Sequence, residues 1–280
     1  MWGIIGGTGF ESFDEFHTIE ELNRTTPFGV ASPGLKRVSI DGTECLFLPR
    51  HGQHHKLLPS EVNYRANIYA LKQHGATKIA AYYAVGSLRE ELHPGDMVVP
   101  TQFINQTHRT KTTTFAGDGI VGHVPLAKPS CQQAIDILSS IQPKLNFTIH
   151  HNKTYIAIEG PVFSTQAESN FYRLMKADII GMTAFPEYAL AREAGVCFLP
   201  CAFVTDFDCW DDTVKHVTIQ QIVSIMKNNN KQGFSLLLEL LKRDFEENHS
   251  CRQSHLANSL LTPRDQVDAK QQEWLAVLGR

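Results

Sequence analysis

The chain has 280 residues, of which 42% are hydrophobic, and its 26 Lys and Arg against 29 Asp and Glu give a formal net charge of −3. This composition excludes global disorder and the strongly basic field of a typical nucleic-acid-binding protein, and the longest apolar runs are shorter than the about 20 residues of a membrane span. The segment Met1–Phe10 does not have the pattern of a signal peptide, and the six cysteines form no CxxC motif. We therefore expect a cytoplasmic protein with reduced thiols, no nucleic-acid partner and no membrane.

Strands and helices are predicted to alternate along most of the chain. Short apolar runs that end in turns predict strands, and helical spacing of apolar residues predicts helices. Such alternation is typical of a parallel sheet with helices on its faces. The predicted strands are Trp2–Ile5, Thr43–Pro49, Lys78–Val85, Asp96–Pro100, Tyr155–Ile158, Asp178–Met182 and Val196–Thr205. The predicted helices are one capped by Ser60 and ended by Gly75, then Thr165–Leu174, Pro186–Ala194 and Thr218–Lys242.

The last 35 residues differ in character from the rest. Glu246–Ser259 is polar and predicts a linker, and a stripe of Val267, Trp274 and Leu278 predicts a short final helix. No stretch rich in Pro, Gly and Ser divides the first 245 residues. We therefore expect one α/β domain, residues 1–245, extended by the linker and helix of residues 246–280, although the length alone suggests two domains.

A glycine-rich turn follows the first predicted strand. In Gly6-Gly7-Thr8-Gly9, successive backbone N–H groups can form a nest for an anion, and the Thr8 hydroxyl can add a donor. Two alternatives stay open: a plain tight turn and a dinucleotide-binding fingerprint for NAD. The fingerprint needs a third glycine that opens a helix, and Ser12 stands at that position.

The strand Thr43–Pro49 runs into Arg50-His51-Gly52. Ligands of parallel α/β sheets collect beyond the carboxyl ends of the strands, so Arg50 is suited to hold a phosphate there, and His51 can serve as a second donor. A solvated surface loop is the alternative. His54 and His55 follow in the same loop, and the spacing of the three histidines is compatible with a metal site. No carboxylate or cysteine is evident as a further metal ligand.

Two carboxylates follow the strand Val196–Thr205, at Asp206 and Asp208. If the loop is partly buried, desolvation and mutual repulsion raise the pKa of one of them, which can then act as an acid. The other can accept hydrogen bonds from an amino group. A solvated pair of aspartates at the entry of a surface loop is the alternative.

Polar and aromatic residues follow two further predicted strands. Phe163 can stack on a flat ring with the Ser164 hydroxyl beside it, and Thr183 can meet a sugar or a phosphate. Each segment by itself is an ordinary turn before a helix. Together the strand ends predict a site for a nucleoside and a phosphate.

The sequence resembles the trimeric purine nucleoside phosphorylase superfamily, and within it the 5′-methylthioadenosine phosphorylases. The resemblance covers Trp2 to Lys242, and the matching stretches occur in the family's order. They are Gly3–Phe10, Pro49–Gly52, Pro59–Leu71, Gly86–Asp96, Glu159–Ser169, Gly181–Glu187 and Thr205–Trp210.

The resemblance implies a fold, a reaction and a set of roles. The fold is a single α/β domain with a central mixed, distorted β-sheet flanked by helices. The reaction is phosphorolysis of 5′-methylthioadenosine to adenine and 5-methylthioribose 1-phosphate. It needs no metal or cofactor, and inorganic phosphate is a co-substrate. The implied roles are phosphate binding by Thr8, Arg50, His51, Ala84 and Thr183, and base binding by Phe163, Ser164, Asp206 and Asp208, with Asp206 as the catalytic acid.

The resemblance also implies a methylthio pocket and a homotrimer. Met182 lies where the family contacts the ribose, and Ile219, Ile222 and Val223 lie where it lines the methylthio pocket. Without the resemblance, the Ile219, Ile222 and Val223 stripe is ordinary helix packing. His123 lies where a neighbouring subunit closes that pocket.

Four positions depart from the family's pattern. Val162 and Gln166 replace arginines, Tyr83 replaces a small threonine beside the phosphate, and Gly181 replaces a frequent asparagine. Because a bulky Tyr83 can narrow the phosphate site, two alternatives stay open. One is a broader purine nucleoside or methylthioinosine phosphorylase, and the other is a catalytically silent nucleoside-binding protein.

Overall fold

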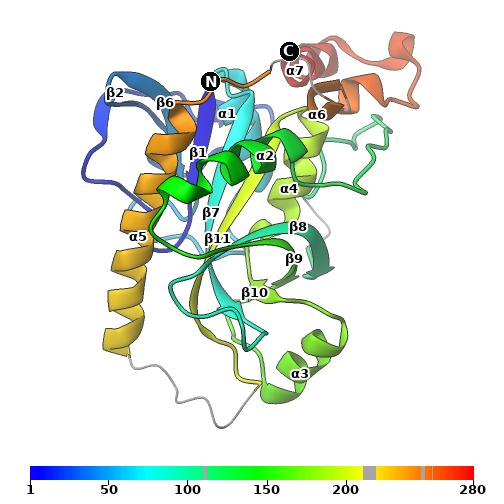
Figure 1. Ribbon diagram of the computed structural model, residues 1–280. Helices are drawn as coiled ribbons and strands as arrows, with labels where there is room; N and C mark the ends of the chain where they lie inside the picture. Colours follow the sequence, from blue (N-terminus) through cyan, green and yellow to red (C-terminus); the bar gives the residue numbers. More distant parts are fainter. Residues whose placement is uncertain (110–111, 211–218, 247–249, 254) are drawn as a thin grey trace.

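The computed structural model describes residues 1–109, 112–210, 219–246, 250–253 and 255–280. It is a layered α/β structure in which helices cover both faces of one sheet, and the two chain ends lie near each other (Figure 1). Within the described residues, no helix combines the length and apolarity needed to cross a membrane. The strands of the sheet are β1 (Trp2–Gly6), β2 (His17–Glu21), β5 (Lys36–Ile40), β6 (Thr43–Pro49), β7 (Lys78–Ser87), β8 (Met97–Gln106), β9 (Ile149–Ile158), β10 (Ile179–Gly181) and β11 (Cys197–Phe207).

The sheet is mixed and closes on itself at one end, which confirms the predicted distorted α/β fold. Across the described residues its order is β10-β9-β8-β11-β7-β1-β6-β5-β2, and β10 pairs with β7 as well as with β9. Strands β10, β9, β8, β11 and β7 therefore form a ring. Within this ring, β11 with β8 and β10 with β7 are antiparallel and the other three pairs are parallel. Outside it, β1 pairs in parallel with β6 and β7, whereas β5 is antiparallel to both β6 and β2. A separate pair is formed by β3 (Thr25–Thr26) and β4 (Gly29–Val30).

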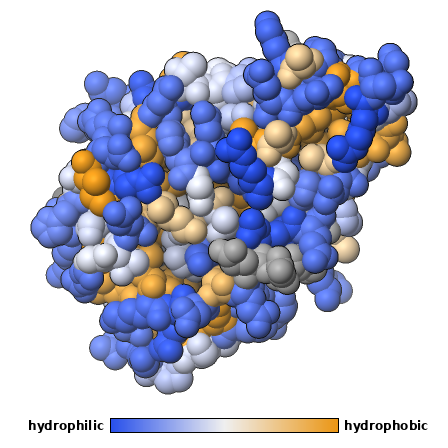
Figure 2. Space-filling view, turned by 90° about the horizontal axis from the view of Figure 1, so that it is seen from above, coloured by the Kyte–Doolittle hydropathy of each residue, from blue (hydrophilic) through white to orange (hydrophobic). Residues whose placement is uncertain are grey.

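The two faces of the sheet bury two separate apolar clusters, because successive side chains of a strand point to opposite faces. On β1, Ile5 packs with α1 (Tyr64–Gln73), α4 (Ala184–Glu193) and α7 (Ala269–Leu278). Its neighbour Ile4 packs with α2 (Gln132–Ile141) and α5 (Ile219–Leu241). The outer surface seen from above is mostly hydrophilic, with small apolar patches between polar residues (Figure 2).

The predicted helices are present, with one corrected start. The helix expected from Ser60 begins at Tyr64, and its N-cap is Asn63, whose side chain accepts from the Ala66 N–H. Asn63 also donates to the Phe28 carbonyl, so a tertiary contact selects it over Ser60. The helix α3 (Gln166–Leu174) begins at Thr165 with a capping box to Glu168, as a Thr-x-x-Glu sequence favours.

The polar segment predicted as a linker, Glu246–Ser259, is in part structured and buried. It contains α6 (Ser250–Gln253) and a short 3-10 turn, Leu256–Asn258. Cys251 packs into one core cluster, and Leu256 packs into the other beside the side chains of α7. In its described part this segment is therefore attached to the core, which its polar composition did not indicate.

Candidate functional site

A cavity of about 640 Å³ opens beyond the carboxyl ends of the strands of the sheet. Its walls come from the segments that follow β1, β6, β9, β10 and β11, and from β7 itself. These segments were predicted to meet because parallel strands end at the same edge. The lining residues are Thr8, Arg50, His51, His55–Pro59, Ala84–Gly86, Ile158, Pro161, Phe163, Ser164, Ile180–Thr183, Thr205–Cys209 and Met226.

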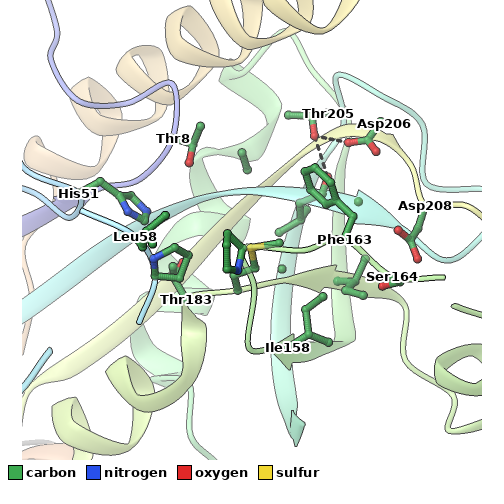
Figure 3. Close-up of a pocket in the computed structure, with 18 of the residues that line it drawn as sticks. Thr8, His51, Leu58, Ile158, Phe163, Ser164, Thr183, Thr205, Asp206 and Asp208 are labelled. Carbon is green, nitrogen blue, oxygen red and sulfur yellow. Dashed lines mark hydrogen bonds between the residues drawn. The ribbon is translucent and has the colours of Figure 1, made fainter. Parts of the chain in front are cut away.

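Ten residues that the sequence singled out line this one cavity. They are Thr8, Arg50, His51, Ala84, Phe163, Ser164, Met182, Thr183, Asp206 and Asp208. In Figure 3, Thr8, His51 and Thr183 lie on one side and Asp206, Asp208 and Ser164 on the other. The arrangement therefore has a hydroxyl- and imidazole-lined end and a carboxylate end.

Two of the remaining predicted residues, Val223 and His123, do not line the cavity in the part of the chain that the structure describes, and two cannot be placed. The side chains of Ile219 and Ile222 lie outside the described part of the structure. Val223 is 46% exposed and is not among the lining residues. His123 is exposed and also absent from the wall. From α5 it is Met226 that reaches the cavity, one turn beyond the stripe that the sequence singled out.

Arg50 is buried, and its charge is balanced by a residue that sequence reasoning missed. Its Nε and Nη2 donate to the two carboxylate oxygens of Glu187 at 2.6 and 2.9 Å, and its Nη1 donates to the Tyr82 carbonyl at 2.9 Å. Glu187 lies in α4, where a helical pattern gives no signal for a buried acid. Three of the five guanidinium N–H groups of Arg50 are thus used among the described residues, and the other two are what it can offer an anion.

Tyr83 does not narrow the cavity, contrary to the concern raised by the sequence. Its ring lies under the Arg50 guanidinium, 4.4 Å from it, and its hydroxyl donates to Glu187 at 2.6 Å. Its neighbour Ala84 lines the cavity. Tyr83 is therefore part of the support of Arg50 and not of the wall.

The approach of Arg50 requires a glycine at position 7. A Cβ there would lie 2.3 Å from Arg50 Nη1 and 2.5 Å from the Tyr82 carbonyl oxygen. The turn is closed by a hydrogen bond from Phe10 N–H to the Gly7 carbonyl at 2.8 Å. No helix follows this turn before β2, which is the wrong context for a dinucleotide-binding fingerprint.

His51 is held in one tautomer. Its Nδ1 is 2.8 Å from the Leu57 carbonyl, which can only accept, so Nδ1 carries the proton. Burial, together with nearby Arg50, lowers the pKa of His51 to about 4. The neutral ring therefore offers its Nε2 lone pair as an acceptor, and the role of His51 as a second donor to phosphate stays a prediction. His55 stacks on it and pairs with Glu11.

Asp206 has the character of an acid. Its pKa is raised to about 6, chiefly by burial and also by the neighbouring Asp208, while the hydrogen bond from Thr205 opposes the shift. The Thr205 hydroxyl lies 2.5 Å from Asp206 Oδ1 and 3.2 Å from the Val85 carbonyl. That hydroxyl has one proton, and the shorter contact directs it to Asp206 Oδ1, so a protonated Asp206 carries its own proton on Oδ2 and can offer it to a ligand.

A bulge in β11 produces this geometry. Val204 is paired with Val85 and Asp206 with Gly86, so Thr205 is an extra residue in the strand. Bulges re-aim side chains and occur often beside active sites. The pattern of apolar and polar residues along this strand gives no sign of the bulge.

Two polar atoms in the cavity wall, Ser164 Oγ and Asp208 Oδ2, are buried without a well-aligned hydrogen bond among the described residues, although Ser169 lies close enough to Asp208 to lower its pKa. Burial raises the pKa of Asp208. Buried polar atoms are nearly always hydrogen-bonded in folded proteins. Two such atoms in one cavity therefore indicate a ligand with complementary donors and acceptors.

Arg109 connects the loops around the cavity, and sequence reasoning missed it. Its Nη1 donates to the Phe185 carbonyl at 2.6 Å, and its Nη2 donates to the carbonyls of Met182 at 2.9 Å and Glu159 at 3.3 Å. Its guanidinium also lies over the ring of Tyr64. The segments after β9 and β10, which carry much of the wall, are thus held by one side chain.

The other departures from the family's pattern are Val162 and Gln166, which do not line the cavity, and Gly181, which does. Val162 is 79% exposed, and Gln166 is exposed at the start of α3. At Gly181 a Cβ would lie 2.0 Å from the Tyr155 hydroxyl, so Tyr155 occupies the space of a side chain at position 181. Tyr83, Val162 and Gln166, the departures that favoured a silent binding protein, are therefore not among the residues that line the cavity.

Comparison with known proteins gives a consistent result. The family model described as "Phosphorylase superfamily" matches residues 2–242. A curated S-methyl-5′-thioadenosine phosphorylase of Geobacter sulfurreducens is 41% identical over 277 residues, covering 99% of this chain and 96% of that protein. The crystal structure of a methylthioadenosine phosphorylase from an Antarctic soil metagenomic library has a TM-score of 0.88 at 39% identity, covering 99% and 98%. The Schistosoma mansoni methylthioadenosine phosphorylase in complex with adenine has a TM-score of 0.80 at 38% identity, covering 86% and 90%.

Proposed function

Because this chain belongs to the S-methyl-5′-thioadenosine phosphorylase family of the phosphorylase superfamily, we propose that it cleaves 5′-methylthioadenosine with inorganic phosphate. The products are adenine and 5-methylthioribose 1-phosphate, and no cofactor takes part. The observation that carries the proposal is the pair of unpartnered buried atoms, Ser164 Oγ and Asp208 Oδ2, beside the acid Asp206 in one cavity.

The carboxylate end binds the base. Breaking the glycosidic bond leaves positive charge on the sugar and negative charge on the base. Protonated Asp206 donates to the purine N7, and general-acid catalysis of this kind contributes about 10²–10⁴-fold. Asp208 Oδ2 accepts from the exocyclic amino group, which favours adenine over hypoxanthine. Phe163, whose side chain is 81% exposed at the wall, stacks on the base when it binds.

The opposite end binds phosphate. The hydroxyls of Thr8 and Thr183 and the two remaining N–H groups of Arg50 donate to it. His51 lies at the same end, and its neutral ring can accept a hydrogen bond at Nε2 from a protonated phosphate oxygen. Bound phosphate then stabilises the cationic sugar and attacks it. Met182 contacts the ribose, and Met226 of α5 lies toward the methylthio group.

We also propose a cytoplasmic homotrimer in which His123 of a neighbouring subunit closes the methylthio pocket. Exposed apolar side chains beside the cavity support an interface there: Val162, Phe163, Phe171 and Leu174. Light scattering on the purified protein tests the mass. His123→Ala is expected to leave the mass unchanged and to raise the KM for methylthioadenosine, and a monomer in solution contradicts the proposal.

The decisive experiment is a substrate panel of methylthioadenosine, adenosine, inosine and methylthioinosine, with and without phosphate. We expect adenine release from methylthioadenosine only when phosphate is present. Equal or greater turnover of the inosine analogues favours a broader purine nucleoside phosphorylase and contradicts the role of Asp208. Binding of methylthioadenosine without any turnover contradicts the proposed reaction.

A further inference from the structure

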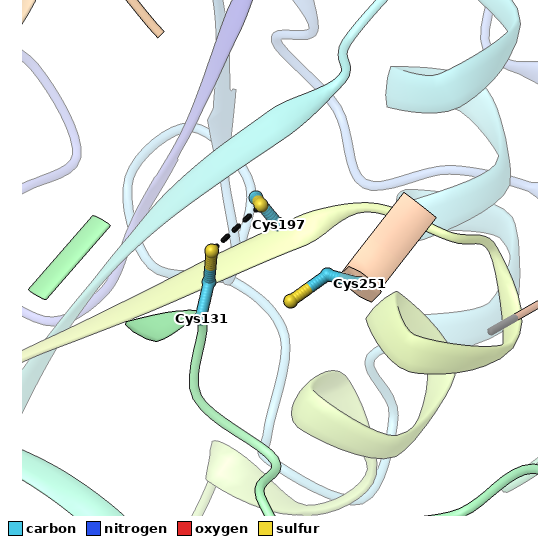
Figure 4. Close-up of side chains that lie close together, drawn as sticks. All are labelled: Cys131, Cys197 and Cys251. Atoms are coloured by element: carbon cyan, nitrogen blue, oxygen red, sulfur yellow. Dashed lines mark hydrogen bonds between the residues drawn. The ribbon is translucent and has the colours of Figure 1, made fainter. Parts of the chain in front are cut away.

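Three cysteine sulfurs meet inside the apolar core, far from the cavity. Cys131 precedes α2, Cys197 begins β11 and Cys251 lies on α6. Their sulfur atoms all lie within 4.8 Å of one another (Figure 4). All six cysteines of the chain lie in the described part of the structure and none is in a disulfide, as the sequence predicted. The proposed function uses none of these three.

Two of the three sulfurs are already close to bonding distance. Cys131 Sγ and Cys197 Sγ are 2.7 Å apart, against about 2.05 Å in a disulfide. Their backbones are adjacent, because the Cys131 N–H donates to the carbonyl of Phe198 at 2.8 Å. A bond between them therefore needs a small movement of two side chains and no rearrangement of the chain.

We propose that Cys131 and Cys197 form a reversible disulfide and that Cys251 is the thiol through which oxidising equivalents enter. Cys251 is 7% exposed, whereas Cys131 is 1% and Cys197 0% exposed, so a small disulfide meets Cys251 first. The short helix α6 that carries it packs on the start of β11, where a Cβ at Gly195 would lie 3.2 Å from the Arg252 carbonyl.

The oxidant is a low-molecular-weight disulfide, RSSR. The Cys251 thiolate attacks it, which forms a mixed disulfide and releases one thiol, RSH. Cys131 then attacks the Cys251 sulfur, and its proton leaves with the second RSH. Cys197 attacks the Cys131 sulfur in turn, and its proton restores Cys251 as a thiol. In total, two protein thiols lose two electrons and two protons, and RSSR becomes two RSH.

The observations favour a disulfide over a thiolate-bound metal ion. Sulfurs that bind one zinc ion at about 2.3 Å stand about 3.8 Å apart, so Cys131 and Cys197 would have to separate. The surrounding cluster is apolar, and burial raises the pKa of the Cys197 thiol. A disulfide is neutral and suits such surroundings, whereas several buried thiolates are costly.

The bond would act on stability and not on the reaction. It closes a loop of 66 residues, and β11 carries the chain about 30 Å from Cys197 to the carboxylates of the cavity. We expect the oxidised protein to melt about 5–10 °C higher than the reduced protein and to keep its activity within twofold.

The test incubates the full-length protein with glutathione at graded ratios of oxidised to reduced form, then unfolds, alkylates and digests it. We expect a mass loss of two hydrogens and a linked peptide pair that contains Cys131 and Cys197. In Cys251→Ser the same bond is expected to form at least about tenfold more slowly. Cys45→Ala, which alters a buried thiol outside the cluster, is expected to leave the rate unchanged.

Three outcomes would overturn the proposal. One is alkylation of all six cysteines at every ratio, and another is a linked pair that involves Cys45, Cys201 or Cys209. The third is protection of the three thiols only when a soft metal ion is added, with the mass of that ion retained. If Cys251→Ser oxidises as fast as the wild type, Cys251 is not the entry thiol. Peptide mapping of the wild type does not depend on whether the variants fold.

Discussion

The guanidinium of Arg50 and the carboxylate of Glu187 form a buried two-point ion pair between residues 137 positions apart. Their side chains are 1% and 0% exposed. Because Glu187 also accepts from the Tyr83 hydroxyl, two residues share its carboxylate: Arg50, which follows β6, and Tyr83 on β7. The cation of the phosphate end is thus fixed in place before any phosphate binds.

Removal of Glu187 is expected to be costly. Glu187→Ala leaves the buried charge of Arg50 and the Tyr83 hydroxyl without their acceptor, so we expect a loss of about 3–5 kcal/mol in the free energy of unfolding. Urea denaturation measures it. Glu20→Ala, which breaks the exposed pair with Arg37, is the matched control and is expected to change stability by less than about 1 kcal/mol. Equal losses in the two variants would contradict the assigned role.

The pKa of Asp206 predicts the pH dependence. Its pKa is raised to about 6 and the protonated form is the active one, so kcat/KM is expected to fall as pH rises through about 6. Asp206→Asn is expected to lose about 10²–10⁴-fold in kcat. Its pH profile is also expected to lose the fall near pH 6, which we call the alkaline limb. Asp208→Asn removes a like charge, so the limb is expected to move to lower pH. An unchanged limb in Asp206→Asn would assign the titration to another group.

Asp208 is expected to determine which base is accepted. Asp208→Asn supplies an amide N–H that a 6-oxo group can accept, and it removes the acceptor for a 6-amino group. The ratio of kcat/KM for methylthioadenosine over methylthioinosine is therefore expected to fall by about 10²-fold or more. Parallel assays on both nucleosides measure this ratio. A variant that loses activity on both to the same extent would show that Asp208 does not read the base.

Gly7 is expected to be intolerant of a methyl group. In Gly7→Ala the new Cβ collides with Arg50 Nη1 and the Tyr82 carbonyl, so Arg50 must move and the KM for phosphate is expected to rise at least about tenfold. Gly75→Ala is the control, because position 75 has positive φ but nothing within 4 Å of an added Cβ. It is expected to cost about 1 kcal/mol of stability and to leave the KM for phosphate unchanged.

His51 is expected to be neutral and protonated on Nδ1 at every pH from 5 to 8. Its pKa is lowered to about 4, and Nδ1 donates to Leu57. Nitrogen NMR of the imidazole rings identifies the tautomer from the distinct shifts of protonated and bare nitrogens. An imidazolium signal for His51 at pH 7 would return it to the role of a donor and remove the argument for a protonated phosphate.

Much of the site could be predicted because it lies where strands end. An apolar run that stops at a polar residue locates Arg50, Asp206 and Thr183 at one edge of the sheet, whatever the strand order. Glu187 could not be predicted, since its helix reads as ordinary and only the fold brings it to Arg50. The bulge at Thr205 and the tautomer of His51 each depend on a single backbone contact. The spacing of apolar residues in the sequence does not indicate such contacts.

In the fold, too, the features with a local sequence pattern could be predicted, and those made by long-range contacts could not. The alternation of strands and helices predicts a layered α/β domain, but the pairing of β10 with β7 joins segments about 90 residues apart and leaves no local pattern. The choice of Asn63 over Ser60 as a helix cap depends on Phe28, which is 35 residues away.

The ring of β7, β11, β8, β9 and β10 has a consequence for local opening. A strand in a closed circuit has no free edge, so none of these strands can peel away without breaking hydrogen bonds on both sides. By contrast, β2 lies at the end of the order with all five residues exposed. Amide hydrogen exchange is therefore expected to be graded across the sheet, fastest at β2 and slowest at β11, whose end carries Asp206.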